Sequence, residues 1–181
     1  MLTITVPAVD MFDEASQEFI QSEETILQLE HSLVSISKWE SEFEKPFLSG
    51  DDKTTAETLG YIRHMTLTEG VDQTVYSRLT KKETDIVSEY INAKMTATTF
   101  KDLPGAKGRG ASNEFVTAEL VYYWMVSLQI PFECQYWHFN RLTTLIKVCN
   151  LKNQPPKKMS RREAMNQHRS LNAQRRAGSG M

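Results

Sequence analysis

The first residues alternate between apolar and polar positions, a pattern that is typical of a β-strand. Leu2-Thr3-Ile4-Thr5-Val6 has period two, contains β-branched residues and ends at Pro7. Residues 23–29 alternate less regularly and form the expected pairing strand. The residues between them predict a long, acidic, hairpin-like connection. The chain is therefore expected to open with a β-hairpin.

After the hairpin, apolar residues recur every three or four positions, which predicts helices. The first helix is expected over 33–43, with Ser32 as its N-cap, and it stops before Pro46. A second helix is expected over 54–65. It opens at a capping box, in which a Thr and a Glu three residues later bond each other's backbone N–H groups.

A second capping box, Thr80 with Glu83, predicts a helix that continues through Met95. Its apolar stripe contains Ile86, Val87, Tyr90 and Ile91. The preceding residues 71–79 predict a short segment that is partly helical. Three glycines and one proline in residues 103–110 predict a loop.

Two long apolar helices are expected next, over 112–129 and from Pro131 through Val148. The tight joint Ile130-Pro131 predicts that they form an αα-hairpin. Because residues 113–151 are rich in large apolar side chains, this hairpin is the expected centre of stability.

Charge is distributed unevenly along the 181 residues, whose formal net charge is −2. Residues 1–52 carry −10, whereas residues 151–181 carry +7. A last helix is predicted over 160–177, with a third capping box at Ser160 and Glu163. The expected fold class is α+β, mostly α, with a body over 1–154 and a basic helical arm over 155–181.

The composition predicts a soluble, intracellular protein. No apolar run reaches the ~18 to 20 residues that a membrane helix needs, and the N-terminus lacks the pattern of a signal peptide. Cys134 and Cys149 fall in one predicted helix, which would place them about 22 Å apart and prevent a disulfide. We expect no membrane partner.

Sequence patterns for catalysis are weak, and we expect a protein that is not an enzyme and has no cofactor. Cys134 and His138 stand four residues apart, which suits either the start of a metal site or, as we favour, a packed thiol beside a half-buried histidine. The glycine-rich run over 105–110 lacks the spacing of a phosphate-binding loop.

The expected partner-binding residues are aromatic and basic. Consecutive aromatic residues point in different directions around a helix, so some of them reach the surface, where Tyr and Trp make good anchors. The arginines of the arm spread around a helix that is polar on most sides, which favours folding against a partner. The candidate residues are Tyr123, Trp124, Trp137, Arg161, Arg162, Arg169, Arg175 and Arg176.

Segments from nearly the whole chain resemble, in the same order, a family of small proteins from tailed bacteriophages, the tail assembly chaperones. The resemblance has no catalytic residues to transfer. The segments are Thr25-Ile26-Leu27-Gln28-Leu29-Glu30-His31-Ser32-Leu33, Ser37-Lys38-Trp39-Glu40, Phe43-Glu44-Lys45-Pro46-Phe47, Met95-Thr96-Ala97-Thr98-Thr99-Phe100, Tyr123-Trp124-Met125, Trp137-His138 with Asn140-Arg141-Leu142, and Pro156-Lys157-Lys158-Met159-Ser160.

This resemblance implies a protein that binds the tape measure protein and other tail proteins in the host cell cytoplasm and keeps the tape measure soluble during tail assembly. A structural tail or neck protein that stays in the virion is the alternative. A nucleic-acid-binding protein acting through residues 151–181 is a third possibility, which the acidic first third of the chain disfavours. Association between copies stays open.

Overall fold

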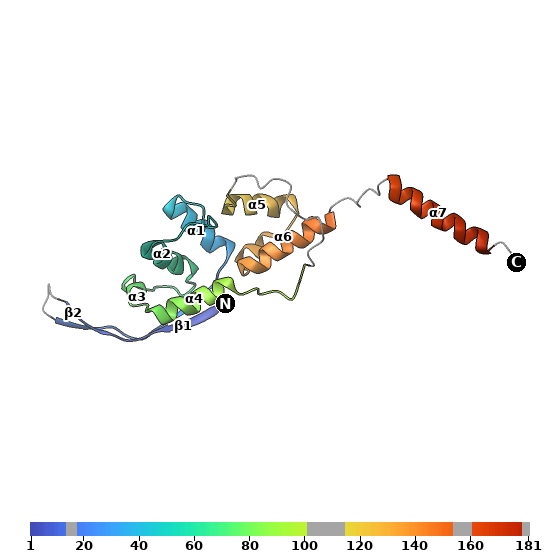
Figure 1. Ribbon diagram of the computed structural model, residues 1–181. Helices are drawn as coiled ribbons and strands as arrows, with labels where there is room; N and C mark the ends of the chain where they lie inside the picture. Colours follow the sequence, from blue (N-terminus) through green and yellow to red (C-terminus); the bar gives the residue numbers. More distant parts are fainter. Residues whose placement is uncertain (14–17, 101–114, 154–160, 179–181) are drawn as a thin grey trace. The chain divides into compact units, whose positions relative to one another are not determined.

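The computed structural model describes residues 1–13, 18–100, 115–153 and 161–178, and Figure 1 shows its elements. The expected fold class is confirmed: an N-terminal antiparallel hairpin precedes a mostly helical chain. The chain divides into two units, Met1–Cys149 and Asn150–Met181, of which the first is the body. The boundary expected between residues 154 and 155 lies outside the described residues.

The hairpin at the start of the body is built as predicted. Strand β1 (Leu2–Val6) pairs antiparallel with β4 (Thr25–Leu29), so that Ile4 lies opposite Leu27. Alternation turns one face of this sheet inward, and the inward residues Ile4, Val6, Leu27 and Leu29 are buried. Its other face carries polar side chains and the exposed Ile26.

The acidic connection between these strands contains two further strands. Strand β2 (Asp10–Asp13) pairs antiparallel with β3 (Glu18–Gln21), so the ribbon continues beyond the first sheet (Figure 1). At the junction, Arg78 donates hydrogen bonds to the hydroxyl of Ser22 at 2.6 Å and to the carbonyl oxygens of Pro7 and Glu23. One arginine thus ties both chains of the ribbon together at its base.

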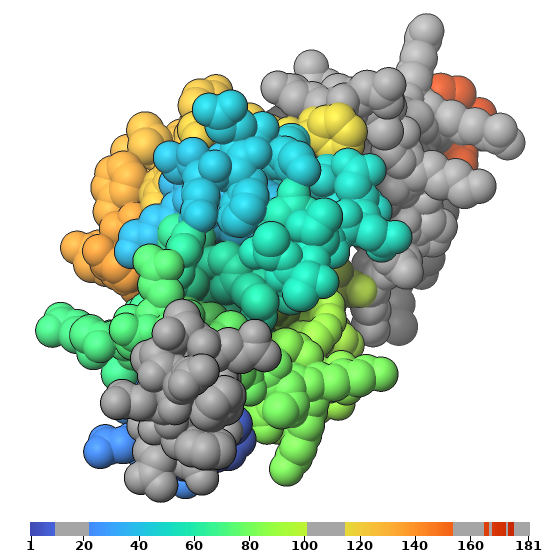
Figure 2. Space-filling model, turned by 90° about the vertical axis from the view of Figure 1, so that its left-hand side faces the viewer, coloured from blue at the N-terminus to red at the C-terminus, as the bar shows by residue number. Residues whose placement is uncertain are grey.

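Helices α1 (Leu33–Phe43) and α2 (Thr55–Met65) follow with the bounds that the sequence predicts. The hydroxyl of Ser32 caps α1, and Thr54 and Glu57 form the predicted capping box of α2. The two helices pack together, and Figure 2 shows them side by side on one face of the body.

Helix α4 (Lys81–Asn92) follows the single turn α3 (Thr74–Ser77) and is shorter than predicted. It ends at Asn92 rather than at Met95, whose φ of 49° is not helical. The side-chain amide of Asn140 donates hydrogen bonds to the carbonyl oxygens of Ile91 and Ala93 at 2.9 and 2.8 Å. These bonds satisfy carbonyl groups that a longer helix would have used internally.

The predicted pair of long helices is wrong in its boundaries and its connection. Helix α5 covers only Ala118–Ser127, and Phe115 to Thr117 before it are not helical. After Pro131 a short 3₁₀ helix, η1 (Phe132–Tyr136), forms instead of a long α-helix. Helix α6 (Phe139–Asn153) begins only afterwards, so Cys134 and Cys149 do not share a helix.

A tertiary contact explains the interruption before α6. Residue His138 forms a β-bridge with Ser32, and the backbone N–H of Phe139 donates to the carbonyl oxygen of His31 at 2.7 Å. These groups would bond within the helix if η1 and α6 were continuous. Cys134 and His138 were expected to lie on one face of a single helix, and this expectation is wrong, because Cys134 belongs to η1 and His138 precedes α6.

The centre of the core is not where the sequence placed it. Among the largest fully buried side chains of the described residues, eight belong to residues 6–65 and three to residues 121–142. The first group contains Val6, Leu27, Leu29, Leu33, Ile36, Trp39, Ile62 and Met65, and the second contains Val121, Met125 and Leu142. The core is thus centred on the β1–β4 sheet, α1 and α2, with α5 and α6 added to it.

The second unit contains α7 (Arg161–Gly178), close to the predicted last helix. Two of its apolar side chains, Met165 and Leu171, are exposed by 54% and 43%. The capping box expected at Ser160 and Glu163 lies outside the described residues and side chains.

Candidate partner-binding surface

Helix α5 is held at its N-terminus by a side chain from α1. The carboxylate of Glu40, which is only 8% exposed, accepts hydrogen bonds from the backbone N–H groups of Ala118 and Phe47, each at 2.7 Å. An anion at this position satisfies an unpaired N–H and interacts favourably with the helix dipole. The contact fixes the first turn of α5 against α1.

Exposed apolar side chains gather on α5 and η1. Ala118, Val121 and Met125 of α5 face the core, whereas the side chains that follow the other face are open to solvent. We call Tyr122, Tyr123, Val126, Phe132 and Tyr136 the aromatic surface; all but the half-buried Tyr122 are 54% to 65% exposed.

Tyr122 joins the two elements that carry the aromatic surface. Its hydroxyl donates to the side-chain oxygen of Gln135 at 3.0 Å, and its ring centroid lies 6.5 Å from that of Phe132. Burial and the neighbouring Tyr136 raise the pKa of Tyr122, so its hydroxyl stays protonated at neutral pH. The helix and the 3₁₀ turn therefore present their rings together.

The three aromatic residues predicted to bind a partner lie in different surroundings. Tyr123 is 65% exposed on the aromatic surface, whereas Trp124 is half-buried at the edge of the core. Trp137 is also half-buried, and the guanidinium of Arg141 lies 4.1 Å from the centre of its ring. Only Tyr123 therefore presents most of its side chain to solvent.

The arginines predicted to bind a partner all belong to α7. Arg169 and Arg175 are exposed. The side chains of Arg161, Arg162 and Arg176 lie outside the described ones. The structure thus assigns the aromatic and basic candidates to different units.

Only Tyr123 of the aromatic surface was among the sequence candidates; Tyr122, Val126, Phe132 and Tyr136 were missing. Val126 stands three residues after Tyr123 and four after Tyr122, and this spacing places the three on neighbouring positions of a helix. That spacing was available from the sequence. The exposure of Phe132 was not, because it depends on the 3₁₀ turn that replaces the expected helix.

A polar cluster lies inside the body between β4, α1, α2, α4 and α6. His31 is hydrogen-bonded to the hydroxyl of Tyr61, and its ring centroid lies 5.0 Å from that of His138. Burial, and then the neighbouring His138, lower the pKa of His31 to about 3. His138 is hydrogen-bonded to the backbone carbonyl oxygen of Tyr90. The side-chain hydroxyl of Tyr90 donates to the carboxylate of Glu30 at 2.7 Å.

The side chains of this cluster can hold the sheet and the helices together, but a substrate would have little access to them. His31 is 2% exposed and His138 is 7% exposed, and the pKa of both histidines is lowered chiefly by burial. Burial also raises the pKa of Tyr61. These groups therefore stay neutral at physiological pH, and their hydrogen bonds connect the sheet to the helices.

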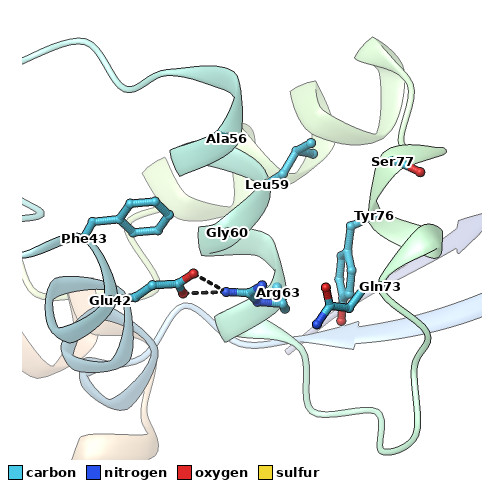
Figure 3. A pocket seen from close by; sticks show the side chains of 9 residues that line it. All are labelled: Glu42, Phe43, Ala56, Leu59, Gly60, Arg63, Gln73, Tyr76 and Ser77. Carbon is cyan, nitrogen blue, oxygen red and sulfur yellow. Dashed lines mark hydrogen bonds and ion pairs between the residues drawn. The ribbon is translucent and has the colours of Figure 1, made fainter.

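A hollow of about 360 Å³ lies between α1, α2 and α3 (Figure 3). Its walls include Phe43, Leu59 and Tyr76, and the carboxylate of Glu42 is hydrogen-bonded to Arg63 at its edge. His64 also bonds Glu42, so the charges here are already paired. Gly60 is also part of the wall. A Cβ at this position would come within 2.8 Å of the Phe43 ring, so the close packing of α1 against α2 leaves no room for a side chain here.

A second hollow of about 400 Å³ lies between α2, α4 and the turn that contains Phe47 and Leu48. It is mostly apolar, and Ile62 and Val87 line it. Lys53 is held at its edge by the carbonyl oxygen of Phe47 at 2.8 Å and lies over the Phe47 ring.

The described residues contain no group of three or more His, Cys, Asp or Glu side chains that could hold a metal ion. Cys134 is buried, and burial raises the pKa of its thiol, as expected for a packed side chain. Within the described chain, no helix combines the length and the apolar character needed to cross a membrane.

Comparison with protein-family models, with curated proteins and with solved structures found no match. The resemblance to phage tail assembly chaperones therefore stays a prediction, as do the candidate partners.

Proposed function

We propose that this protein is a tail assembly chaperone that binds the tape measure protein and keeps it soluble during phage tail assembly. The observation that carries the proposal is the aromatic surface on α5 and η1. Tyr123, Val126, Phe132 and Tyr136 are each more than half exposed. Exposed apolar side chains gathered in one place are typical of surfaces that bind another protein.

The anchoring of α5 supports a binding role for this surface. Glu40 fixes the start of the helix, and Tyr122 couples the helix to η1 through Gln135. A surface held in place before binding loses less conformational entropy when a partner arrives. Tape measure proteins are long and helical, and an unassembled helical rod presents apolar stripes that aromatic side chains can cover.

Co-expression with the tape measure protein tests the proposal. We expect the full chain to increase the soluble fraction of the tape measure and to be recovered with it in a pull-down. The double variant Tyr123→Ala and Phe132→Ala removes two exposed rings and should reduce recovery about tenfold or more, because truncating an aromatic anchor costs ~1 to 2 kcal/mol or more.

A matched control is Leu67→Ala, which truncates a side chain that is 54% exposed and outside the aromatic surface. Its recovery with the tape measure should equal that of the unchanged chain. Equal recovery of the aromatic double variant would refute the role of this surface. If purified virions contain the protein in fixed proportion to the tail proteins, it is a structural virion component instead.

A further inference from the structure

The second hollow, between α2, α4 and the turn at Phe47, is lined mainly by apolar side chains. The ring centroids of Phe47 and Tyr61 lie 4.2 Å apart on one side of it. Ile62 and Val87, each 2% exposed, and the half-buried Ile91 also line it. Concave sites with mostly apolar walls and a few polar groups are typical of small-molecule binding sites.

Two of these walls are held in place by hydrogen bonds to other parts of the body. The backbone N–H of Phe47 donates to the buried carboxylate of Glu40 at 2.7 Å, which fixes the turn. The hydroxyl of Tyr61 is hydrogen-bonded to His31. Because these walls are ordered before binding, a ligand would lose little free energy to reorganising them.

Lys53 places a positive charge at the edge of the apolar walls. Its ammonium group donates to the carbonyl oxygen of Phe47 at 2.8 Å and lies 4.5 Å from the centre of the Phe47 ring. An ammonium group has more N–H donors than this one bond uses. Within the described residues, no carboxylate forms an ion pair with Lys53, which is half-buried. The remaining donors suit an anion, since hydrogen bonds between charged groups are the stronger ones.

Lys53 dominates the electrostatics of this hollow. Of the described residues that line it, Lys53 alone is charged. Asp51 and Asp52 precede it in the chain, and Asp85 and Glu89 belong to α4. These carboxylates are exposed and do not line the hollow. Salt and water screen their effect on a bound anion more than that of a group in direct contact.

The volume of the hollow limits the size of the ligand. It measures about 400 Å³, and a water molecule takes about 30 Å³ in the liquid, so there is room for on the order of ten non-hydrogen atoms. We propose that the hollow binds a small monocarboxylic acid, whose apolar group packs against Phe47 and Val87 and whose carboxylate accepts hydrogen bonds from Lys53. The described lining residues share no member with the aromatic surface, so this proposal does not depend on the tape measure protein.

Titration of the full, ¹⁵N-labelled chain with octanoate, followed by its amide chemical shifts, tests the site. We expect a dissociation constant on the order of 1 mM or below, as for other ligands of this size, and shifts in residues 47–62 and 84–91. Octanol has the same apolar chain without the charge and should bind at least tenfold more weakly. Equal affinity for the two ligands, or shifts that lie elsewhere, would overturn the proposal.

Two lysine variants separate the charge of Lys53 from general effects of charge. Lys53→Met removes the ammonium group but keeps an apolar stem, so it should weaken octanoate binding at least tenfold and leave octanol binding unchanged. Lys81→Met is the matched control, because Lys81 is exposed at the start of α4 and does not line the hollow. Its affinities should equal those of the unchanged chain. Octanoate binding that is equally tight in Lys53→Met would contradict the proposal.

A third variant fills the hollow. Ser88 of α4 lines it but is itself exposed, so Ser88→Phe introduces a ring without replacing a core side chain. Both ligands should bind at least tenfold more weakly, while a melting curve like that of the unchanged chain shows that the fold is kept. Undiminished binding of octanoate to the folded variant would show that it binds elsewhere and would overturn the site.

The C-terminus of another protein offers the same chemistry, an apolar group beside a carboxylate. The dipeptide acetyl-alanyl-leucine, with its carboxylate free, is the probe for this source. We expect it to bind more weakly than octanoate, because its amide groups would lose water against mostly apolar walls. Tighter binding of the dipeptide would overturn the assignment to a small molecule and indicate a protein partner instead.

Discussion

Glu40 of α1 and Ala118 of α5 are 78 positions apart in the chain, yet the buried carboxylate of the first accepts the backbone N–H of the second at 2.7 Å. The same carboxylate accepts the N–H of Phe47 through its other oxygen. Thr117, at the N-cap position of α5, makes no side-chain capping bond. A residue from another helix thus supplies the cap that the local sequence lacks.

The first prediction concerns this cap. Glu40→Gln leaves one acceptor oxygen for two N–H donors, so a buried N–H loses its partner, and we expect the free energy of unfolding to fall by ~1 to 3 kcal/mol. Glu44→Gln, at an exposed position one turn later, is the control and should change it by less than about 0.5 kcal/mol. Urea denaturation measures both, and equal stability of the two variants would contradict the assignment.

The second prediction compares two tryptophans. Trp39 is 1% exposed, and its indole N–H donates to the carbonyl oxygen of Glu57 at 2.8 Å. We expect Trp39→Ala to cost ~3 to 5 kcal/mol, because it opens a cavity and leaves that carbonyl without its bond. Trp124→Ala, at the half-buried edge, should cost clearly less. The reverse order in denaturant melts would place the stability centre back at residues 113–151.

The elements that the sequence predicted correctly are those that local interactions determine. The alternation of Leu2 to Val6, the N-cap Ser32 and the capping boxes at Thr54 and Thr80 all act within a few residues. Helix α1 ends just before Pro46, which disfavours a helical conformation in the residue before it. Such rules need no information about distant parts of the chain.

The elements that it missed depend on distant partners. Residues 131–138 were expected to be helical, but His138 pairs with Ser32 and the N–H of Phe139 bonds His31. The role of Glu40 was equally hidden, since a glutamate on a predicted helix is usually solvated. The aromatic surface was predicted only in part, because the exposure of each ring depends on how α5 and η1 pack.

The third prediction concerns stability at mildly acidic pH. His31 has a pKa of about 3 in the folded protein, and an unfolded histidine has a pKa of ~6.5. Below about pH 6.5 the unfolded state binds a proton that the folded state does not, so stability falls as the pH falls. The slope should approach ~1.4 kcal/mol per pH unit for this group, and His138, also lowered, acts in the same direction.

The carboxylates contribute to the pH dependence of stability in a different, more acidic range. The hydrogen bond from Lys45, followed by those from the Thr54 N–H and hydroxyl, lowers the pKa of Glu57 to about 2, so its contribution is lost only below about pH 4.5. Urea melts between about pH 7 and 5 therefore report the histidines. His31→Gln should flatten the slope there, whereas His168→Gln on α7 should leave it unchanged. An unchanged slope in His31→Gln would show that His31 is protonated in the folded protein.

The last prediction concerns the base of the β2–β3 ribbon. Arg78 donates to the hydroxyl of Ser22 and to the carbonyl oxygens of Pro7 and Glu23, on both chains of the ribbon, where β1 ends and β4 begins. Among the described residues, Arg78 makes the hydrogen bonds that join this part of the ribbon to the helices, so we expect Arg78→Ala to free the ribbon from the body while the core stays folded. Amide hydrogen exchange over 8–24 should rise at least tenfold, because each lost charged hydrogen bond contributes ~1.5 to 3 kcal/mol.

Arg78→Lys keeps the charge but cannot reach all these acceptors at once, so its exchange should be intermediate. Exchange in the core strand β4, read at Leu27 and Leu29, serves as the internal control and should not change. If Arg78→Ala leaves exchange over 8–24 as slow as in the unchanged chain, the ribbon is held by its own strand pairing, and Arg78 does not anchor it.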